Sequence, residues 1–310
     1  MADEMQAVVQ RNKDSEPILS KEAIPKPRFE DHQALVKLSH VAQNPTDVQT
    51  FDRNAFGDGE IKGVGAYAEY TVADERISFK IPPGISPAAA STVPLAAATA
   101  WLAMFSKDSL NISRNSSTTI LVWGGSSSVG LYTIQLACTQ NFTVITTCSP
   151  RNFDLVKSVG AQHVFDYSDA DVVNRIKQVA PDLQYVFDTI GNESSSAIAS
   201  KAIRQQGGGL CTVRPGKANT EECTAQTKVT DVLVWTAFLK DHAYGELKWP
   251  ANEDDHEIAA ELFENLPEWL EKGVVKPNAQ SVKKGLEKVK DGFQEHRDGK
   301  ISAYKIVYEV

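Results

Sequence analysis

The stretch T-I-L-V-W-G-G-S-S-S-V-G, residues 119–130, indicates the fold of the chain around it. Residues 120–123 form a short apolar run, which is typical of a buried parallel strand. Two glycines and three serines follow, and apolar residues then resume with helical spacing over residues 129–136. The stretch therefore predicts a strand, a tight turn and a helix in succession.

The turn between that strand and helix has the chemistry of an anion site. The first N–H groups of a helix and the positive end of its dipole point into such a turn, where a pyrophosphate can bind. Gly125 and Gly130 stand where the dinucleotide-binding pattern G-x-G-x-x-G has its first and last glycines, and Ser127 replaces the middle one. Two interpretations are open at this point: a dinucleotide site, or a strand-to-helix turn that binds nothing.

A second strand is predicted at residues 142–147, and the residues after it indicate which dinucleotide fits. An NAD-binding chain normally offers Asp or Glu here for the ribose hydroxyls. This chain offers Ser149, Arg151 and Asn152, a neutral and basic set suited to a 2′-phosphate, and the nearest acid, Asp154, lies inside the next predicted helix. Ser149 can equally cap that helix, and both interpretations can hold together because a helix N-terminus is itself an anion site.

Strands and helices go on alternating through the middle of the chain. We expect helices at residues 152–159, 171–179 and 194–202, and strands at residues 163–166, 185–189 and 209–213. Repeated strand–helix units of this length predict an α/β fold with a doubly wound parallel sheet. Ligands of such sheets bind at the carboxyl ends of the strands, so the candidate cofactor neighbours are Tyr167, Thr189, Ile190, Gly191, Val213 and Arg214.

Residues 1–90 have the pattern of a separate antiparallel β domain. Residues 34–42 and 65–72 alternate apolar and polar side chains, like strands with one solvated face. Residues 88–105 are rich in alanine and are interrupted by Pro94, which predicts a helix, a break and a second helix.

Three further elements are expected in the last third of the chain. Residues 229–239 are apolar and predict an amphipathic helix that packs in the core, although the same residues could line a channel for an acyl chain. Residues 278–291 have an apolar stripe that predicts a helix, and residues 302–309 alternate like a strand.

Composition and charge restrict the classes of function. The chain has 310 residues, a hydrophobic content of 42% and a charged content of 23%, which is ordinary for a globular protein. A formal net charge of −8 at pH 7 disfavours binding to nucleic acid or to an anionic membrane, since both attract clustered positive charge. The acidic start M-A-D-E differs from a secretory signal and no apolar run reaches the length of a membrane span, so we expect a cytoplasmic protein. The four cysteines show no C-x-x-C pair and no histidine at ligand spacing, so we predict no metal site.

Six short motifs occur in order over nearly the whole chain. The first four are N-P-T-D from residue 44, G-A-Y-A-E-Y from residue 65, I-P-P from residue 81 and P-L-A-A-A-T-A from residue 94. The glycine turn at residues 119–130 and K-I-S-A-Y-K-I-V from residue 300 complete the set. Together they resemble the medium-chain dehydrogenase/reductases, in the zinc-independent branch of quinone-oxidoreductase-like proteins and enoyl reductases. The segments T-C-S-P-R-N-F-D and V-F-D-Y, which begin at residues 147 and 164, are similar to the 2′-phosphate segment of the fungal reductases that serve polyketide synthases in trans.

The resemblance implies a GroES-like β domain and an NADPH-binding Rossmann domain, with hydride transferred in the cleft between them. The expected ranges are residues 1–100 for the first part of the GroES-like domain, 101–260 for the Rossmann domain and 261–310 for a return to the GroES-like domain. The implied diphosphate site comprises Gly125, Ser126, Ser127, Ser128, Val129 and Gly130. The implied 2′-phosphate site comprises Ser149, Arg151, Asn152 and Tyr167, and the nicotinamide edge would lie near Thr189, Ile190 and Val213.

Two departures from the family pattern affect the substrate domain. Relatives carry a long block with two strand motifs where this chain passes directly through residues 57–62. Either the sequence omits residues here, or the substrate domain has unpaired sheet edges and an open substrate cleft. Many relatives have Lys two residues after N-P-T-D, where this chain has Gln49, so the resemblance assigns no proton donor. The polar catalytic candidates are Thr46, Gln49 and Tyr67, with water as a further proton source; their ordinary alternatives are a helix cap, a surface position and a half-buried strand position.

Three functions remain open from the sequence. The first is an NADPH-dependent enoyl or enone reductase, which adds hydride at the β-carbon and a proton at the α-carbon of an activated C=C bond. It would act in trans on a polyketide intermediate, with an acyl-thioester or small-molecule substrate and a polyketide synthase or acyl carrier as partner. The second is a quinone or small-enone reductase, and the third is a non-redox protein or pseudoenzyme that has kept the nucleotide-binding fold. We expect a monomer or a homodimer.

Overall fold

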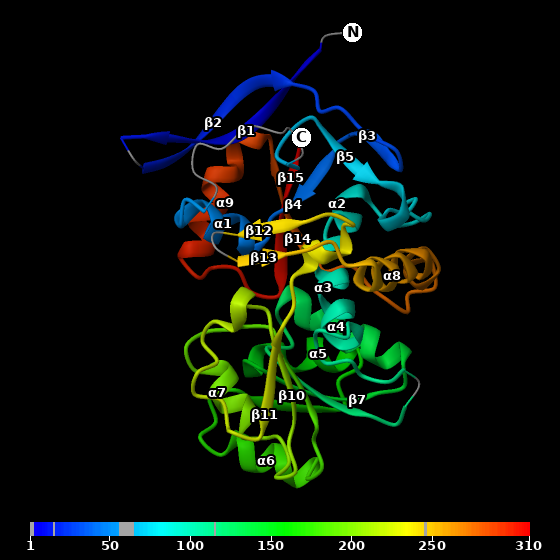
Figure 1. Ribbon diagram of the computed structural model, residues 1–310, viewed down its shortest axis with the longest axis vertical. Coiled ribbons are helices and arrows are strands. Elements are labelled where there is room, and N and C mark those ends of the chain that lie inside the picture. Colours follow the sequence, from blue (N-terminus) through cyan, green and yellow to red (C-terminus); the bar gives the residue numbers. More distant parts are fainter. Residues whose placement is uncertain (1–2, 15, 56–64, 115, 245–246) are drawn as a thin grey trace. The chain divides into compact units, whose positions relative to one another are not determined.

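The computed structural model describes residues 3–14, 16–55, 65–114, 116–244 and 247–310, which fall into two compact units (Figure 1). Unit 1 comprises Met1–Pro94, Lys240–Ala251 and Pro277–Val310, and unit 2 comprises Leu95–Leu239 and Asn252–Lys276. The long helix α8, Glu253–Glu271, lies wholly in unit 2, whereas our predicted ranges divide it at residue 260.

Unit 2 is built on a six-stranded parallel sheet with the strand order β11-β10-β9-β6-β7-β8. The strands are β6 (Thr119–Trp123), β7 (Thr143–Cys148), β8 (His163–Asp166), β9 (Tyr185–Asp188), β10 (Gly208–Thr212) and β11 (Thr227–Asp231). Numbered within the sheet, this is the order 3-2-1-4-5-6 of the Rossmann fold, in which the chain changes direction between the first and fourth strands. The predicted doubly wound parallel sheet is confirmed, and the direction change lies between β6 and β9.

Helices connect these strands as the alternating pattern predicts. They are α4 (Ser128–Thr139), α5 (Phe153–Ser158), α6 (Val172–Val179) and α7 (Ser195–Ser200), with α8 later in the chain and α3 (Pro94–Phe105) before β6. Among the described residues, one helical stretch, Pro87–Phe105, is long and apolar enough to span a membrane, contrary to our expectation of none. Since 78% of its apolar window is buried inside the protein, it has the character of a core helix.

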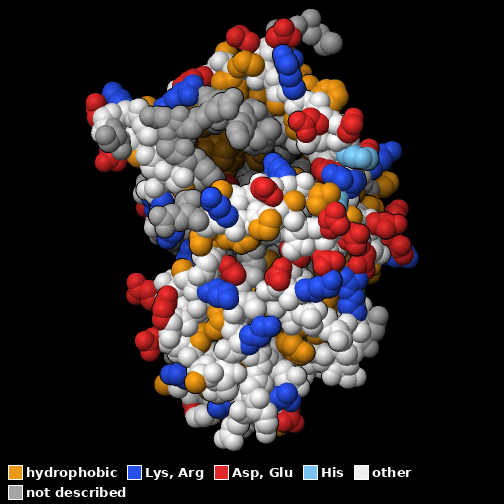
Figure 2. All heavy atoms as spheres, in the orientation of Figure 1, with side chains coloured by type: hydrophobic (Ala, Val, Ile, Leu, Met, Phe, Trp, Pro, Cys, Tyr) orange, Lys and Arg blue, Asp and Glu red, His pale blue; other side chains and the backbone are white. Residues whose placement is uncertain are grey.

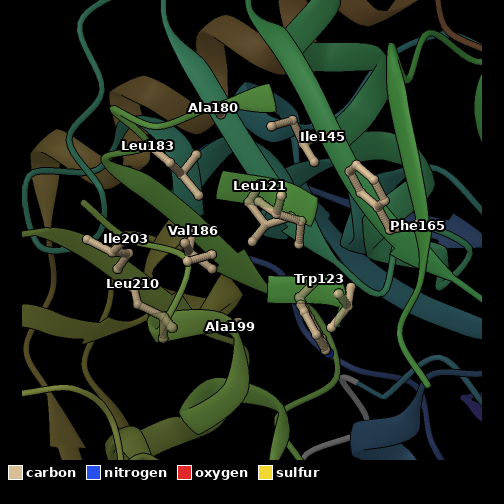
Figure 3. Packing of buried hydrophobic residues seen from close by; sticks show 13 residues of the cluster. Leu121, Trp123, Ile145, Phe165, Ala180, Leu183, Val186, Ala199, Ile203 and Leu210 are labelled. Carbon is tan, nitrogen blue, oxygen red and sulfur yellow. The ribbon is translucent and has the colours of Figure 1, made fainter. Parts of the chain in front are cut away.

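One hydrophobic cluster of unit 2 lies between the sheet and the helices α6 and α7 (Figure 3). Leu121, Ile145 and Val186 come from neighbouring strands and are fully buried, and Ala199 of α7 and Ile203 pack against them. Strands buried on both faces read as continuous apolar runs, which is why the sequence pattern identified β6 and β7 correctly.

Unit 1 is assembled from small sheets, which fit a GroES-like β domain. A long antiparallel hairpin joins β1 (Glu4–Lys13) to β2 (Glu16–Pro25), and β3 (Gln33–Lys37) pairs with β5 (Tyr70–Asp74). A three-stranded sheet has the order β14-β15-β4, and the last hairpin is β12–β13; these strands are β14 (Ala279–Lys284), β15 (Tyr304–Glu309), β4 (His40–Ala42), β12 (His242–Tyr244) and β13 (Leu247–Trp249). The helices are α1 (Pro45–Asp52), α2 (Pro87–Ala90) and α9 (Val289–Arg297). The predicted deletion near residues 57–62 lies outside the described residues.

Two predicted helices are wrong. In the predicted helix 278–291, residues 279–284 instead form strand β14, which runs parallel to β15; after Gly285, with φ +89°, the chain is helical as a 3₁₀ turn at Leu286–Lys288 and then as α9 from Val289. Residues 229–239 continue β11 and then form a short 3₁₀ turn at Val234–Ala237 instead of an amphipathic helix. In both cases the first part of the predicted helix pairs with a neighbouring strand instead, and this pairing overrides the apolar spacing.

The predicted strand at residues 34–42 is divided between two sheets. Its first half is β3, and its second half is β4, which pairs antiparallel with β15. The predicted helix, break and helix at residues 88–105 are confirmed as α2 and α3, and the hairpin β1–β2 was not predicted.

The charged side chains of the two units are mixed in sign. On the face shown in Figure 2, lysine and arginine side chains of the described residues lie interspersed with aspartate and glutamate side chains. Some of the charged side chains form ion pairs, for example Lys107 with Asp254 at an N–O distance of 2.7 Å.

Candidate functional site

Three glycines shape the turn after β6 in unit 2. Gly124 has φ +89°, in the left-handed region that favours glycine. A Cβ atom at Gly125 would lie 2.0 Å from Oγ1 of Thr146, and one at Gly130 would lie 2.4 Å from the carbonyl oxygen of Gly124. The turn therefore packs directly on β7, and α4 begins directly against it. The first N–H groups of α4, which have no partner within a helix, face the carboxyl edge of the sheet.

Ser127 caps α4 and joins the turn to β9. Its hydroxyl oxygen accepts a hydrogen bond from the N–H of Gly130 at 2.9 Å, and it lies 2.8 Å from Oγ1 of Thr189. Thr189 Oγ1 in turn lies 2.9 Å from the carbonyl oxygen of Gly124. The serine in place of the pattern's middle glycine thus has a definite structural role as the N-cap. Its neighbours Ser126 and Ser128 are half-buried at the same edge.

The carboxyl ends of the central strands lie at one level. Trp123 pairs in register with Thr147 on one side and with Asp188 on the other, and Asp188 pairs with Thr212. The residues that follow these strand ends therefore share one edge of the sheet. Main-chain hydrogen bonds connect them: the N–H of Gly125 donates to the Thr147 carbonyl at 2.9 Å, Thr189 donates to Trp123 at 3.1 Å, and Val213 donates to Asp188 at 3.2 Å.

Asp188 holds the loop after β9 in place. Its carboxylate is fully buried and accepts hydrogen bonds from the hydroxyls of Ser195 and Ser196, at 2.5 and 2.7 Å, and from the N–H groups of Ile190 and Gly191, at 3.0 and 3.1 Å. The side chain of Ile190 lies over Gly124, since a Cβ atom on Gly124 would come within 2.5 Å of it, and it is 38% exposed. This arrangement presents Ile190 as an apolar surface at the strand edge, where a flat ring of a ligand can pack.

The loop after β10 is anchored to the same place. Nε of Arg214 donates to the carbonyl oxygen of Gly191 at 2.7 Å, and the side-chain amide of Asn219 donates to that oxygen at 2.9 Å. Val213 is half-buried beside them. Arg214 therefore connects two loops that carry predicted cofactor neighbours.

The residues predicted to hold a 2′-phosphate lie on two adjacent strand ends. Cys148 and Asp166 are paired in register, so the next residues, Ser149 and Tyr167, both start at the same edge. Ser149 begins the 3₁₀ turn Pro150–Asn152, but its side chain makes no capping hydrogen bond, so capping does not occupy its hydroxyl. Tyr167 is 52% exposed.

The other members of this set differ in exposure. Arg151 is exposed, whereas Asn152 is only 9% exposed and uses its N–H to donate to the Ser149 carbonyl at 2.9 Å. The carboxylate of Asp166 accepts hydrogen bonds from the N–H and hydroxyl of Ser168, at 2.9 and 2.7 Å, and so is engaged in its own turn. A cavity of about 660 Å³ opens beside Tyr167 along α6 and α7, and its lining does not include Ser149, Arg151 or Asn152.

Cys148 is a buried thiol at this edge. All four cysteines are among the described residues and are free thiols. Burial, with a contribution from the charge of Asp166, raises the pKa of Cys148 to about 11. The group is therefore protonated and weakly nucleophilic at neutral pH.

The predicted catalytic residues lie in unit 1, around the start of α1. Asn44 and Asp47 form a capping box at this helix, and the Asp47 carboxylate accepts from the N–H of Asn44 at 2.7 Å. Thr46 is exposed in the first turn and Gln49 is half-buried in the second. The hydroxyl of Tyr67 donates to the same Asp47 oxygen at 2.7 Å, so one candidate is tied to the N-P-T-D motif.

Lys305 of β15 completes this polar cluster. It is 5% exposed, and its ammonium group donates to Oδ1 of Asn44 at 2.5 Å. Burial lowers the pKa of Lys305 to about 8, and the charge of Asp47 acts against that change. Burial likewise raises the pKa of Asp47, opposed by the hydrogen bond from Tyr67. Burial and the adjacent Asp47 charge raise the pKa of Tyr67 well above its ordinary value.

Sequence reasoning missed Asp188, Lys305 and Asp47 as members of these sites. Asp188 ends an apolar strand, Y-V-F-D, and Lys305 stands inside the run Y-K-I-V-Y. A charged residue within or at the end of a buried strand needs a polar partner. A charged residue in an apolar run of the sequence therefore indicates a buried polar cluster. The roles assigned to the thirteen predicted cofactor residues and to Thr46, Gln49 and Tyr67 stay predictions.

Comparison with known sequences identifies the family. A family model described as "Zinc-binding dehydrogenase" matches residues 128–229. The trans-enoyl reductase fsa3 of Fusarium sp. (strain FN080326) is 36% identical over 252 residues, which cover 79% of this chain and 71% of that protein. The chain belongs to the medium-chain dehydrogenase/reductase superfamily. A zinc-type alcohol dehydrogenase-like protein of Schizosaccharomyces pombe is 31% identical over 259 residues, covering 79% of this chain and 73% of that protein.

Solved structures of this superfamily share the fold. The CurK enoyl reductase superposes with a TM-score of 0.73 at 14% identity, covering 99% of this chain and 98% of that chain. The quinone oxidoreductase of Coxiella burnetii superposes with a TM-score of 0.72 at 19% identity, covering 99% of each chain. At these identities the likeness concerns the fold alone.

Within the described part of this chain, no three His, Cys, Asp or Glu side chains come together in an arrangement that could hold a metal ion. Zinc-independence stays an expectation.

Proposed function

We propose that this chain is an NADPH-dependent reductase of an activated carbon–carbon double bond that acts in trans on an acyl thioester. The observation that carries the cofactor part is the pair of adjacent strand ends after β7 and β8. They offer Ser149, Arg151 and Tyr167, and the carboxylate of Asp166, which ends β8, is engaged by Ser168. An edge with hydroxyl and guanidinium donors favours a 2′-phosphate over the free ribose hydroxyl of NADH.

The fit of a dinucleotide is supported by the turn after β6. Gly125 and Gly130 permit close packing that any Cβ atom would prevent, so the N-terminus of α4 lies at the sheet edge. The pyrophosphate would bind at residues 126–130, and Thr189, Ile190 and Val213 would contact the nicotinamide part. When bound, NADPH supplies the hydride for the β-carbon of the substrate.

The substrate class is supported by the relatives. The Fusarium protein at 36% identity is named a trans-enoyl reductase, and the same name recurs in Talaromyces variabilis at 35% identity. We therefore propose an enoyl thioester as the substrate and a polyketide synthase, through its acyl carrier, as the partner. In such a reduction the protein must stabilise charge on the carbonyl oxygen and allow a proton to reach the α-carbon.

The residues of unit 1 proposed to face the substrate are Thr46, Gln49 and Tyr67. Gln49 can donate a neutral hydrogen bond from its amide, and it cannot supply a proton as a lysine could. Thr46 offers an exposed hydroxyl in the first turn of α1. We therefore propose water as the source of the proton for the α-carbon.

Calorimetric titration of the whole chain with NADPH, and separately with NADH, tests the cofactor assignment. We expect selective binding of NADPH, followed by oxidation of NADPH at 340 nm when an enoyl thioester of N-acetylcysteamine or of a carrier protein is added. If the protein reduces free quinones or small enones and does not reduce the thioesters, it is a quinone or small-enone reductase and the proposed function is wrong. A folded protein that binds neither dinucleotide would refute the redox function altogether.

A further inference from the structure

The polar cluster around Asn44 in unit 1 joins three parts of the chain. Asn44 donates its N–H to Asp47 at 2.7 Å, accepts from the ammonium of Lys305 at 2.5 Å, and donates its side-chain amide to the Ala42 carbonyl at 3.3 Å. Asp47 accepts the Tyr67 hydroxyl at 2.7 Å. One asparagine thus lies between a buried ammonium group and the carboxylate that holds Tyr67.

The ring of Tyr67 is fixed by its neighbours. Its centroid lies 5.7 Å from that of Tyr308 and 6.1 Å from that of Phe293, both in edge contacts. Tyr308 is held in turn, because its hydroxyl donates to Oε1 of Gln43 at 2.5 Å. With the ring fixed, the orientation of the Tyr67 O–H bond depends on its acceptor, Asp47.

The state of Asp47 determines what the Tyr67 oxygen offers to a ligand. While the carboxylate is ionised it accepts only, so the tyrosine proton points to it and the lone pairs of the tyrosine oxygen are left for a donor. A protonated Asp47 could donate instead and turn the tyrosine proton outward. The hydrogen bonds from the Tyr67 hydroxyl and from the Asn44 N–H favour the ionised carboxylate of Asp47, and the charge of Lys305 adds a smaller contribution in the same direction.

We propose that Lys305 is a positioning residue for Tyr67: through Asn44 it keeps Asp47 ionised, so that the Tyr67 oxygen faces the substrate as a hydrogen-bond acceptor and not as a proton donor. The proposal rests on the proposed function in assuming that Tyr67 faces the substrate. It predicts that the substrate group at Tyr67 carries an N–H or O–H donor, such as an amide of a thioester arm, and that the α-carbon proton has another source.

The other charged groups on the elements around this cluster form their own ion pairs or influence Tyr308. On α9, Glu295 pairs with Lys283 of β14 at 2.6 Å and Asp291 pairs with Lys288 at 3.1 Å, and both acids act on Tyr308. At the end of α1, Asp52 pairs with Arg297 at 2.5 Å. The remaining titratable groups on β4 and β15 are His40, Tyr304 and Glu309. Asp47 is the charged group that acts on Lys305.

Nuclear magnetic resonance of the full chain with ¹³C-labelled tyrosine ring carbons tests the coupling without reference to activity. The Tyr67 signal is assigned with Tyr67→Phe. We expect this signal to change near pH 8 in the wild type, as Lys305 loses its proton, and to lose that change in Lys305→Met. Lys305→Arg should keep the low-pH signal throughout, Asp47→Asn should abolish the change, and Lys284→Met, at an exposed lysine of β14, should leave it intact.

A Tyr67 signal in Lys305→Met that follows pH as in the wild type would overturn the positioning role. If Lys305→Met does not fold, the wild type alone decides, because a Tyr67 signal that stays constant from pH 7 to pH 9 contradicts the proposal. These outcomes hold whether or not the protein reduces enoyl thioesters, so failure of the proposed function is seen separately.

Steady-state kinetics test the acceptor role on the proposed substrate. Removing one hydrogen bond to a neutral donor in Tyr67→Phe should raise KM by up to roughly tenfold while kcat stays within about twofold. The effect on KM should be absent for a thioester whose arm lacks the amide. A loss of kcat by a factor of roughly one hundred or more with unchanged KM would identify Tyr67 as the proton donor and refute the proposal.

Discussion

Replacement of Lys305 by Met should change how the stability of unit 1 depends on pH. Lys305 is 5% exposed, and burial lowers the pKa of its ammonium from the ordinary value of 10.5 to about 8. One pKa unit corresponds to about 1.4 kcal/mol, so the difference between the two pKa values corresponds to about 3 kcal/mol. That is the free-energy cost of keeping this charge in the folded protein rather than in the unfolded chain.

The sign of the effect follows from which state binds the proton more tightly. The folded pKa lies below the unfolded one, so between pH 8 and 10.5 the unfolded chain keeps a proton that the folded protein has released. The contribution of Lys305 to the free energy of unfolding therefore rises with pH across this window, and the full cost is present below pH 8. Lys305→Met has no proton to release and should lack this rise.

The measurement is the free energy of unfolding from urea denaturation at several pH values, for the wild type and for Lys305→Met. Circular dichroism gives the transition, and hydrogen exchange of peptides from β15 assigns it to unit 1. Groups other than Lys305 that titrate in this window are present in both proteins and cancel in the difference. We expect the difference between the two free energies to change by about 3 kcal/mol from about pH 7.5 to pH 10.5.

The matched control is Lys284→Met, an exposed lysine at the end of β14, which should give a curve parallel to that of the wild type. The value at neutral pH is less informative, because the methionine also leaves the side-chain oxygen of Asn44 without its donor, at a cost of about 1 to 3 kcal/mol. Parallel curves for Lys305→Met and the wild type would refute the assignment of Lys305 as a buried, titrating charge.

Three substitutions and one labelling experiment test unit 2. Gly125→Ala places a methyl group 2.0 Å from Oγ1 of Thr146, so we expect a loss of about 1 to 3 kcal/mol in urea unfolding and weaker dinucleotide binding by calorimetry. Ser127→Ala removes the N-cap of α4 and should lower the free energy of unfolding by about 1 kcal/mol, and an unchanged value would contradict the capping role. Arg151→Ala should weaken NADPH binding by roughly tenfold or more and leave NADH binding within about twofold, whereas equal weakening of both would remove the 2′-phosphate assignment. Cys148, with a pKa of about 11, should resist iodoacetamide at pH 8 in the folded protein and react after denaturation; rapid labelling of the folded protein would show that it is not buried.

The Rossmann part could be predicted from the sequence because its signals are local. Each strand of the sheet is a short apolar run, each crossover helix follows within a few residues, and the glycine turn marks the boundary between them. The strand at residues 163–166 was predicted with its observed bounds, and β6, β7 and β9 were predicted to within one residue at each end. The strand ends then follow from the fold class, since parallel strands present their carboxyl ends at one edge.

Unit 1 was less predictable because its strands are chosen by distant partners. Residues 278–291 have the apolar stripe of a helix, yet residues 279–284 pair in register with β15, more than twenty residues further along. Residues 34–42 read as one strand, yet their two halves join different sheets. A window of about ten residues contains no information on such pairing, and the pairing determines the structure.

The cluster around Asn44 shows the same limit at the level of a site. Asn44 and Lys305 are separated by 261 positions in the chain, so spacing within a motif cannot reveal their contact. A strand with one solvated face alternates buried and exposed side chains, yet the four consecutive residues 305–308 of β15 are all at most 5% exposed. Such a strand lies in the middle of its sheet with both faces covered, and a lysine in it must have a polar partner because an isolated buried ammonium is too costly. The N-P-T-D motif provides that partner, since Asn44 accepts the hydrogen bond of Lys305 and Asp47 supplies the opposite charge. The asparagine and the aspartate of the motif therefore have a structural role that does not depend on the substrate.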